Sequence, residues 1–87
     1  MVYPAKLTLY YYPSCFYCQR VLSVIEQLQV DVELHDILIE SESRRELIAA
    51  RGRSTVPVLR IFSEQGETWM PESRDIVAYL EKNFAKF

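Results

Sequence analysis

The chain has two cysteines, Cys15 and Cys18, and both lie in the stretch Tyr-Tyr-Pro-Ser-Cys-Phe-Tyr-Cys-Gln-Arg over residues 11–20. A disulfide between them would close so short a loop that it would constrain the unfolded chain very little. A structural zinc site needs four ligands, and the sequence adds only His35 to the two thiols, so we expect no metal. Two interpretations remain, a redox-active pair of thiols or two incidental cysteines.

The residues around the pair favour the redox interpretation. Cys15 follows a predicted strand and begins a predicted helix, where free backbone N–H groups and a partial positive charge stabilise a thiolate. Thiols at such positions and in Cys-X-X-Cys motifs typically ionise between about pH 3.5 and 7.5. We therefore expect Cys15 to attack a substrate disulfide. Cys18 lies one turn further along the same helix face, so we expect it to be buried and to resolve the mixed disulfide.

The alternative is that Cys18 is an ordinary core residue and that Cys15 has no role, because cysteine is among the most buried residue types. This explanation is weaker for the pair than for either residue alone. A Cys-X-X-Cys motif at the strand-to-helix junction of a βαβ unit is typical of thioredoxin-like redox proteins.

Hydrophobic spacing predicts the elements that position the pair. A buried strand is expected over residues 6–12, followed by a helix over 15–29 that Ser14 caps. Residues 30–36 alternate apolar and polar side chains with period two, which predicts a half-exposed strand.

The middle of the chain predicts a charged helix over residues 41–51. Leu47, Ile48 and Ala50 are expected to face inward, and Gly52 ends the helix.

The last third predicts a hairpin and a helix. Strands are expected over 55–62 and 67–70, joined by a turn, and Ser73 caps the final helix. Because βαβ units are right-handed, the first two strands are expected to be parallel. The order βαβαββα therefore predicts an α/β fold with one mixed four-stranded sheet flanked by helices.

Length and composition fit a single domain over residues 1–87. The chain is 49% hydrophobic and 25% charged, with a formal net charge of −2. No segment is strongly basic, so we expect no nucleic-acid binding. No apolar run approaches the roughly 20 residues of a membrane span, and the N-terminus does not resemble a signal peptide. We expect a cytoplasmic monomer that does not bind membranes.

Three separated motifs resemble those of glutaredoxins, a family of the thioredoxin-like superfamily. They are Cys15-Phe16-Tyr17-Cys18, Thr55-Val56-Pro57, and the segment from Trp69 to Ile76. The motifs occur in the expected order and span nearly the whole chain. The resemblance implies a thioredoxin-like fold and a thiol–disulfide exchange that uses glutathione as co-substrate.

The resemblance also implies a glutathione site around the cysteines. It implies that Pro57 is cis and that the backbone of Val56 pairs with the cysteine part of glutathione. Arg53 matches a basic position for the glycine carboxylate, which an arginine can hold with two parallel hydrogen bonds. We also expect Tyr17 to contact glutathione. An ordinary trans proline and a solvated loop arginine are the alternatives.

The start of the last helix is expected to bind the other end of glutathione. Free N–H groups there suit an anion, and the Ser73 hydroxyl adds a donor. The resemblance implies that the γ-glutamyl carboxylate docks at Glu72, Ser73 and Arg74. Ser73 could equally cap the helix, and both roles can hold together.

Three features depart from the glutaredoxin pattern. Tyr12 stands where many glutaredoxins have a lysine near glutathione. A tyrosine has no charge at pH 7, and the charges of Arg53 and Arg20 could replace that of the lysine. Phe16 replaces a proline. The Glu72-Ser73 pair is more similar to the N-terminal domain of glutathione S-transferases, which has the same fold and binds glutathione at that pair. A full transferase needs a second, helical domain, so transferase activity is disfavoured.

The leading hypothesis is a glutathione-dependent thiol–disulfide oxidoreductase. Its partners would be glutathione, disulfide-containing proteins and, indirectly, glutathione reductase. One alternative is a module similar to the transferase N-terminal domain, which binds glutathione or a protein without turnover. Another is a carrier of a [2Fe–2S] cluster, in which two monomers each contribute a cysteine and a glutathione.

Overall fold

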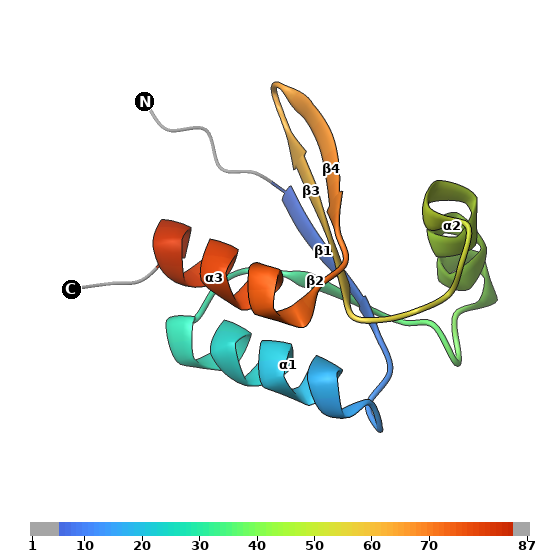
Figure 1. Ribbon diagram of the computed structural model, residues 1–87, viewed down its shortest axis with the longest axis horizontal. Coiled ribbons are helices and arrows are strands. Elements are labelled where there is room, and N and C mark those ends of the chain that lie inside the picture. Colours follow the sequence, from blue (N-terminus) through green and yellow to red (C-terminus); the bar gives the residue numbers. More distant parts are fainter. Residues whose placement is uncertain (1–5, 85–87) are drawn as a thin grey trace.

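The structure is a computed structural model that describes residues 6–84. This part of the chain forms four strands and three helices (Figure 1). In chain order they are β1 (Lys6–Tyr11), α1 (Phe16–Leu28), β2 (Glu33–Asp36), α2 (Ser41–Arg51), β3 (Val58–Ser63), β4 (Gly66–Met70) and α3 (Ser73–Phe84).

The strands form one mixed sheet in the order β2-β1-β3-β4. β1 runs parallel to β2 and antiparallel to β3, and β3 and β4 form an antiparallel hairpin. Helices α1 and α3 lie side by side on one face of the sheet, and α2 covers part of the other (Figure 1). The predicted α/β fold and its βαβαββα order are confirmed.

Two hydrophobic clusters fill the two faces of the sheet. The larger lies between the sheet and the α1–α3 pair, with Leu9, Val21, Leu59, Ile76 and Leu80 fully buried. Successive strand residues point to opposite faces, so Tyr10 leaves this cluster and joins a smaller one beneath α2. Its buried members are Tyr10, Ile37, Leu47 and Val58. The sheet is therefore anchored on both faces at the end of β1, where the cysteines follow.

Several predicted boundaries differ from the observed ones. β1 ends at Tyr11 rather than residue 12, and β2 begins at Glu33 rather than residue 30. β3 begins at Val58, because Pro57 has no N–H to donate to a strand ladder. Helix α1 begins at Phe16, and its N-cap is Cys15 rather than Ser14.

Helix α2 buries fewer side chains than its sequence suggested. Leu47 is buried, but Ile48 and Ala50 are exposed, and the second buried residue of the helix is Ser43. The predicted end at Gly52 is confirmed, with Gly52 in the left-handed conformation at φ 77°. None of the helices in the described part of the chain is long and apolar enough to cross a membrane.

Candidate functional site

Cys15 occupies the N-cap of α1, where the chain leaves β1 and turns into the helix. Its backbone is extended, at φ −81° and ψ 123°, and its sulfur accepts a hydrogen bond from the backbone N–H of Cys18 at 3.3 Å. A sulfur at this position takes the part that a serine or aspartate oxygen plays at other helix starts. The helix therefore directs an N–H donor at Cys15 Sγ, as expected for a thiol that reacts as an anion.

Cys18 lies on the inner face of the same helical turn and is fully buried. Burial raises the pKa of its thiol to about 12, and the hydrogen bond with Cys15 adds to the effect. At neutral pH Cys18 is therefore protonated. Both thiols are free. The prediction that Cys18 is buried is confirmed, and Cys15 is also buried, with 9% of its surface exposed.

The loop between α2 and β3 brings a cis proline up to Cys15. The Val56–Pro57 peptide bond is cis, as the family resemblance implied. The carbonyl oxygen of Val56 lies 4.0 Å from Cys15 Sγ, within reach of the weak hydrogen bond that a thiol donates. Two segments 41 residues apart in the sequence thus meet at the reactive sulfur.

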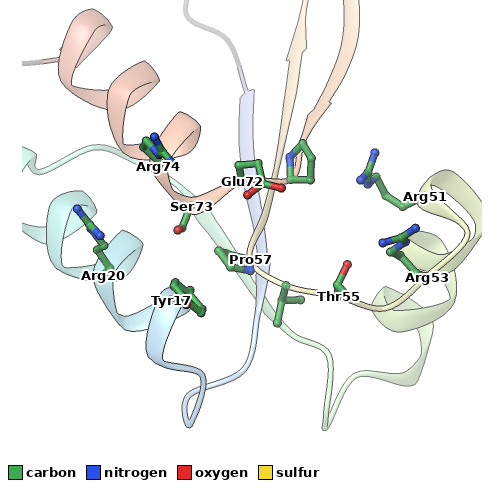
Figure 2. Close-up of a pocket in the computed structure, with 11 residues that line it drawn as sticks. Tyr17, Arg20, Arg51, Arg53, Thr55, Pro57, Glu72, Ser73 and Arg74 are labelled. Carbon is green, nitrogen blue, oxygen red and sulfur yellow. The ribbon is translucent and has the colours of Figure 1, made fainter.

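A pocket of about 480 Å³ opens beside this contact. Its walls come from α1, the end of α2, the loop before β3 and the start of α3 (Figure 2). It collects most of the predicted glutathione contacts, namely Tyr17, Arg53, Val56, Pro57, Glu72, Ser73 and Arg74. Its size falls in the range of roughly 300–1,000 Å³ that is usual for small-molecule sites.

The pocket is strongly positive for an acidic protein. Four arginines and a single carboxylate, that of Glu72, line it. Figure 2 shows Arg20 and Arg74 on one side, and Arg51 and Arg53 on the other. Within residues 6–84 the ion pairs join Lys6, His35 and Arg60 to glutamates, and none involves a pocket arginine. The four guanidinium groups are therefore available to an anionic ligand.

Helix α3 presents its N-terminus to the pocket. The N–H of Ile76 donates to the Glu72 carbonyl at 2.9 Å, so Ser73 is the first helical residue and Glu72 precedes it. Ser73 was predicted to cap the helix from outside, but it lies within the first turn and its hydroxyl points into the pocket (Figure 2). Unpaired N–H groups and this hydroxyl form a ready anion site.

Comparison with known protein families assigns the chain. A model of the glutathione S-transferase N-terminal domain matches residues 9–86. The chain belongs to this family. Its fold is accordingly the thioredoxin-like fold of transferase N-terminal domains, and the resemblance drawn from the Cys-X-X-Cys, Thr-Val-Pro and Glu-Ser motifs is confirmed.

Individual members of the family give the same assignment. The chain is 32% identical to Glutaredoxin 2 of Escherichia coli K12 over 77 residues, which are 87% of this chain and 33% of that protein. The trimeric glutathione transferase TDR1 of Leishmania is 30% identical, with a TM-score of 0.72 over 91% of this chain and 17% of its own. A delta-class glutathione transferase of Nilaparvata lugens is 29% identical, with a TM-score of 0.69 over 93% and 37%. The chain thus spans about a third of the curated relative's length.

One predicted contact lies elsewhere in this transferase-type domain. Tyr12 is half-buried and packs against the cluster of Tyr10, Ile37, Leu47 and Val58, outside the lining of the pocket. Its backbone contacts the cysteine motif, because its carbonyl accepts the N–H of Cys15 at 3.2 Å. We expect a lysine at this position to extend into solvent, whereas the tyrosine ring packs against the apolar cluster.

Sequence reasoning missed three members of the pocket, Arg51, Thr55 and Pro71. Arg51 ends α2, where a basic residue also suits the helix dipole, so its sequence position gave no separate signal. Its Nε is buried and has no hydrogen-bond partner in the described part of the chain. Arg51 belongs to the candidate site by its place in the pocket lining.

Proposed function

We propose that this chain is a glutathione-dependent thiol–disulfide oxidoreductase domain of the glutaredoxin type. The observation that carries the proposal is the junction at Cys15. Its sulfur receives an N–H donor from the helix start and adjoins the carbonyl of Val56, and Val56 in turn lines the arginine-rich pocket. A ligand bound along that wall with its own sulfur near Val56 reaches Cys15.

Each end of glutathione has a complementary group in the pocket. We assign the glycine carboxylate to Arg53, which can bind it with two parallel hydrogen bonds. The γ-glutamyl carboxylate is assigned to the first turn of α3, with Ser73 and Arg74. Its ammonium group is assigned to the Glu72 carboxylate. The backbone of Val56 then pairs with the central cysteine of the tripeptide.

The reaction is an exchange of disulfides. The Cys15 thiolate attacks the glutathione sulfur of a mixed disulfide, that disulfide breaks, and the substrate leaves as a thiolate that takes a proton from water. A second glutathione thiolate then attacks the glutathionyl sulfur on Cys15, which releases glutathione disulfide and restores the Cys15 thiolate. Glutathione supplies both electrons.

Cys18 offers a second route for the same intermediate. It can attack Cys15 Sγ, passing its proton to the departing glutathione thiolate, and leave a Cys15–Cys18 disulfide that two glutathione molecules reduce. Burial keeps Cys18 protonated at neutral pH, so we expect this second route to be the slower one.

A second candidate function is glutathione binding without turnover. The observation that favours it is the family match, because the same domain forms the N-terminal part of glutathione S-transferases. Tyr12, in place of a charged residue near the thiol, points the same way.

The test is reduction of a glutathionylated peptide, coupled to glutathione reductase and NADPH. We expect turnover in the wild type and a loss of at least about 100-fold in Cys15→Ser. Cys18→Ser is the matched control, because the same change is made one turn away, and it should stay within about tenfold of wild type since glutathione can resolve the intermediate. Full activity in Cys15→Ser would refute the assignment. Saturable glutathione binding without turnover would establish the second candidate instead.

A further inference from the structure

The arginine pocket holds more positive charge than glutathione needs. Its four guanidinium groups outnumber the Glu72 carboxylate by three charges. Glutathione at neutral pH carries two carboxylates and one ammonium, a net charge of −1. With glutathione bound, the pocket would keep an excess of two positive charges.

Two arginines account for this excess. If Arg53 and Arg74 serve the two carboxylates of glutathione, Arg20 and Arg51 have no partner. They stand on opposite sides of the pocket, Arg20 on α1 and Arg51 at the end of α2 (Figure 2). The N-terminal half of α1 also carries Tyr17, which is 58% exposed, so this side of the pocket is open to a second molecule.

Arg51 also has no ion-pair partner within the described part of the chain. Its Nε is buried and unpaired in the described part of the chain. A carboxylate in the pocket would neutralise the charge of the Arg51 guanidinium group, which lines it.

The net charge of the whole chain has the opposite sign to that of the pocket. The whole chain has a formal net charge of −2, although four of its ten basic residues line this one pocket. An acidic partner is thus repelled by the surface in general and attracted at the mouth of the pocket. Such an arrangement orients the encounter and raises its rate.

We infer that the preferred substrates are glutathionylated peptides or protein segments in which acidic residues flank the modified cysteine. The glutathionyl half occupies the pocket, and carboxylates of the other half pair with Arg20 and Arg51. The chemistry is the same exchange, in which Cys15 takes the glutathionyl group and the acidic segment leaves as its thiol. The inference rests on the proposed function for its reaction, but the binding preference can be measured without turnover.

The test uses three glutathionylated peptides that differ only beside the cysteine, with glutamate, glutamine or lysine there. Binding is measured on Cys15→Ser, which cannot react, by fluorescence anisotropy. At low salt the glutamate peptide should bind about three- to tenfold more tightly than the glutamine peptide, and the lysine peptide more weakly than both. At roughly 0.5 M salt the differences should fall below about twofold.

Arginine variants in the same background locate the preference. Arg20→Gln and Arg51→Gln should each reduce the ratio between the glutamate and glutamine peptides, and the double variant should bring it to about one. Arg44→Gln is the matched control, because Arg44 is an exposed arginine of α2 outside the pocket lining, and it should keep the wild-type ratio. Should Arg51→Gln fail to fold, Arg51→Lys, which keeps the charge, and Arg20→Gln still test the claim.

Two results would overturn the inference. One is equal affinity for all three peptides at low salt, and the other is an undiminished preference in the double variant. Absence of turnover with every peptide in the reactive wild type would instead refute the oxidoreductase function, whatever the order of affinities.

Discussion

Cys15 and Cys18 are both largely shielded from solvent, yet they belong to different environments. The sulfur of Cys15 meets a backbone N–H at the open end of a helix and the carbonyl of Val56 at the pocket wall. Cys18 faces the interior, where burial raises the pKa of its thiol to about 12. One turn of helix thus separates a thiol that can meet a substrate from one that can meet only its neighbour.

Selective alkylation follows from this difference. A thiol reacts with iodoacetamide as the thiolate, so a buried thiol with a pKa of about 12 is inert at pH 7.5. We expect the folded protein to take up one label, at Cys15, and to take up a second only after denaturation. Peptide mapping by mass spectrometry locates the label. Labelling of Cys18 at a comparable rate in the folded state would contradict this account.

Residues that belong to a short motif could be predicted from the sequence. Residues whose role depends on the tertiary structure could not. The two cysteines, Val56 and Pro57 were predicted from short motifs. Arg51 was not, because its role depends on α2 ending beside a loop that joins a distant strand. Tyr12 was expected near glutathione from its place in the motif, but its ring is held by apolar contacts with Tyr10 and its neighbours.

Helix α3 links the fold to the ligand through its first turn. Because Ser73 lies inside the helix, its hydroxyl is free to bind an anion rather than to cap. We expect Ser73→Ala to weaken glutathione binding by roughly tenfold, the worth of one hydrogen bond to a charged group. The melting temperature should change little. Isothermal titration measures the affinity, and thermal unfolding measures the stability. A large loss of stability with unchanged affinity would mean that Ser73 caps the helix and does not bind the ligand.

Helix α2 is joined to β2 by a small polar cluster around His35. Nδ1 of His35 lies 2.6 Å from a carboxylate oxygen of Glu40 and 2.9 Å from the hydroxyl of Ser43, and Nε2 lies 3.2 Å from Glu33. Burial alone would lower the pKa of His35, but Glu40 and Glu33 outweigh it and raise the pKa above its ordinary value. The same contacts lower the pKa values of Glu40 and Glu33.

A pH-dependent contribution to stability follows. The raised pKa of His35 stabilises the fold fully below about pH 6.5, and the gain is lost as pH rises through the folded value. The lowered pKa values of the glutamates act above about pH 4.3 and are lost as pH falls. We therefore expect the stability difference between wild type and His35→Asn to be largest near pH 5–6 and to shrink towards pH 8.5. Urea unfolding across this range measures it, and a constant difference would count against a charged His35.

Predicted elements matched the observed ones in type and order, and differed at their ends. The segment 55–57 was expected to extend β3, but a proline without an N–H cannot pair there, and the cis peptide faces Cys15 instead. α2 was expected to bury Ile48, yet it lies against the sheet through few side chains. Periodicity reports which residues are apolar, and the exposure of an apolar residue depends on what packs against it.

The whole molecule depends on the cluster between the sheet and the α1–α3 pair. Leu59, in the central part of the sheet, is fully buried, whereas Leu38 is 66% exposed. Leu59→Ala should therefore cost about 2–5 kcal/mol of unfolding free energy. The matched change Leu38→Ala should stay within about 0.5 kcal/mol. Urea denaturation of both variants measures the contrast; equal losses would mean that the core lies elsewhere.

The sheet, the two clusters and the three separated motifs converge on one place, the junction of β1, α1 and the cis-proline loop. The topology could be predicted because right-handed βαβ units and short hairpins leave few alternatives. The charge of the pocket could not, since its arginines come from α1, the end of α2, the loop after it and α3. Only the folded chain brings them together.

The most direct test of the central claim is the transfer of a glutathionyl group to Cys15. Cys18→Ser, which cannot resolve the intermediate, is mixed with a glutathionylated peptide and followed by intact-mass spectrometry. We predict one glutathionyl adduct per chain, on Cys15, formed at least about tenfold faster than on a free cysteine at the same pH. Formation of the adduct no faster than on free cysteine, or no adduct, would contradict the account.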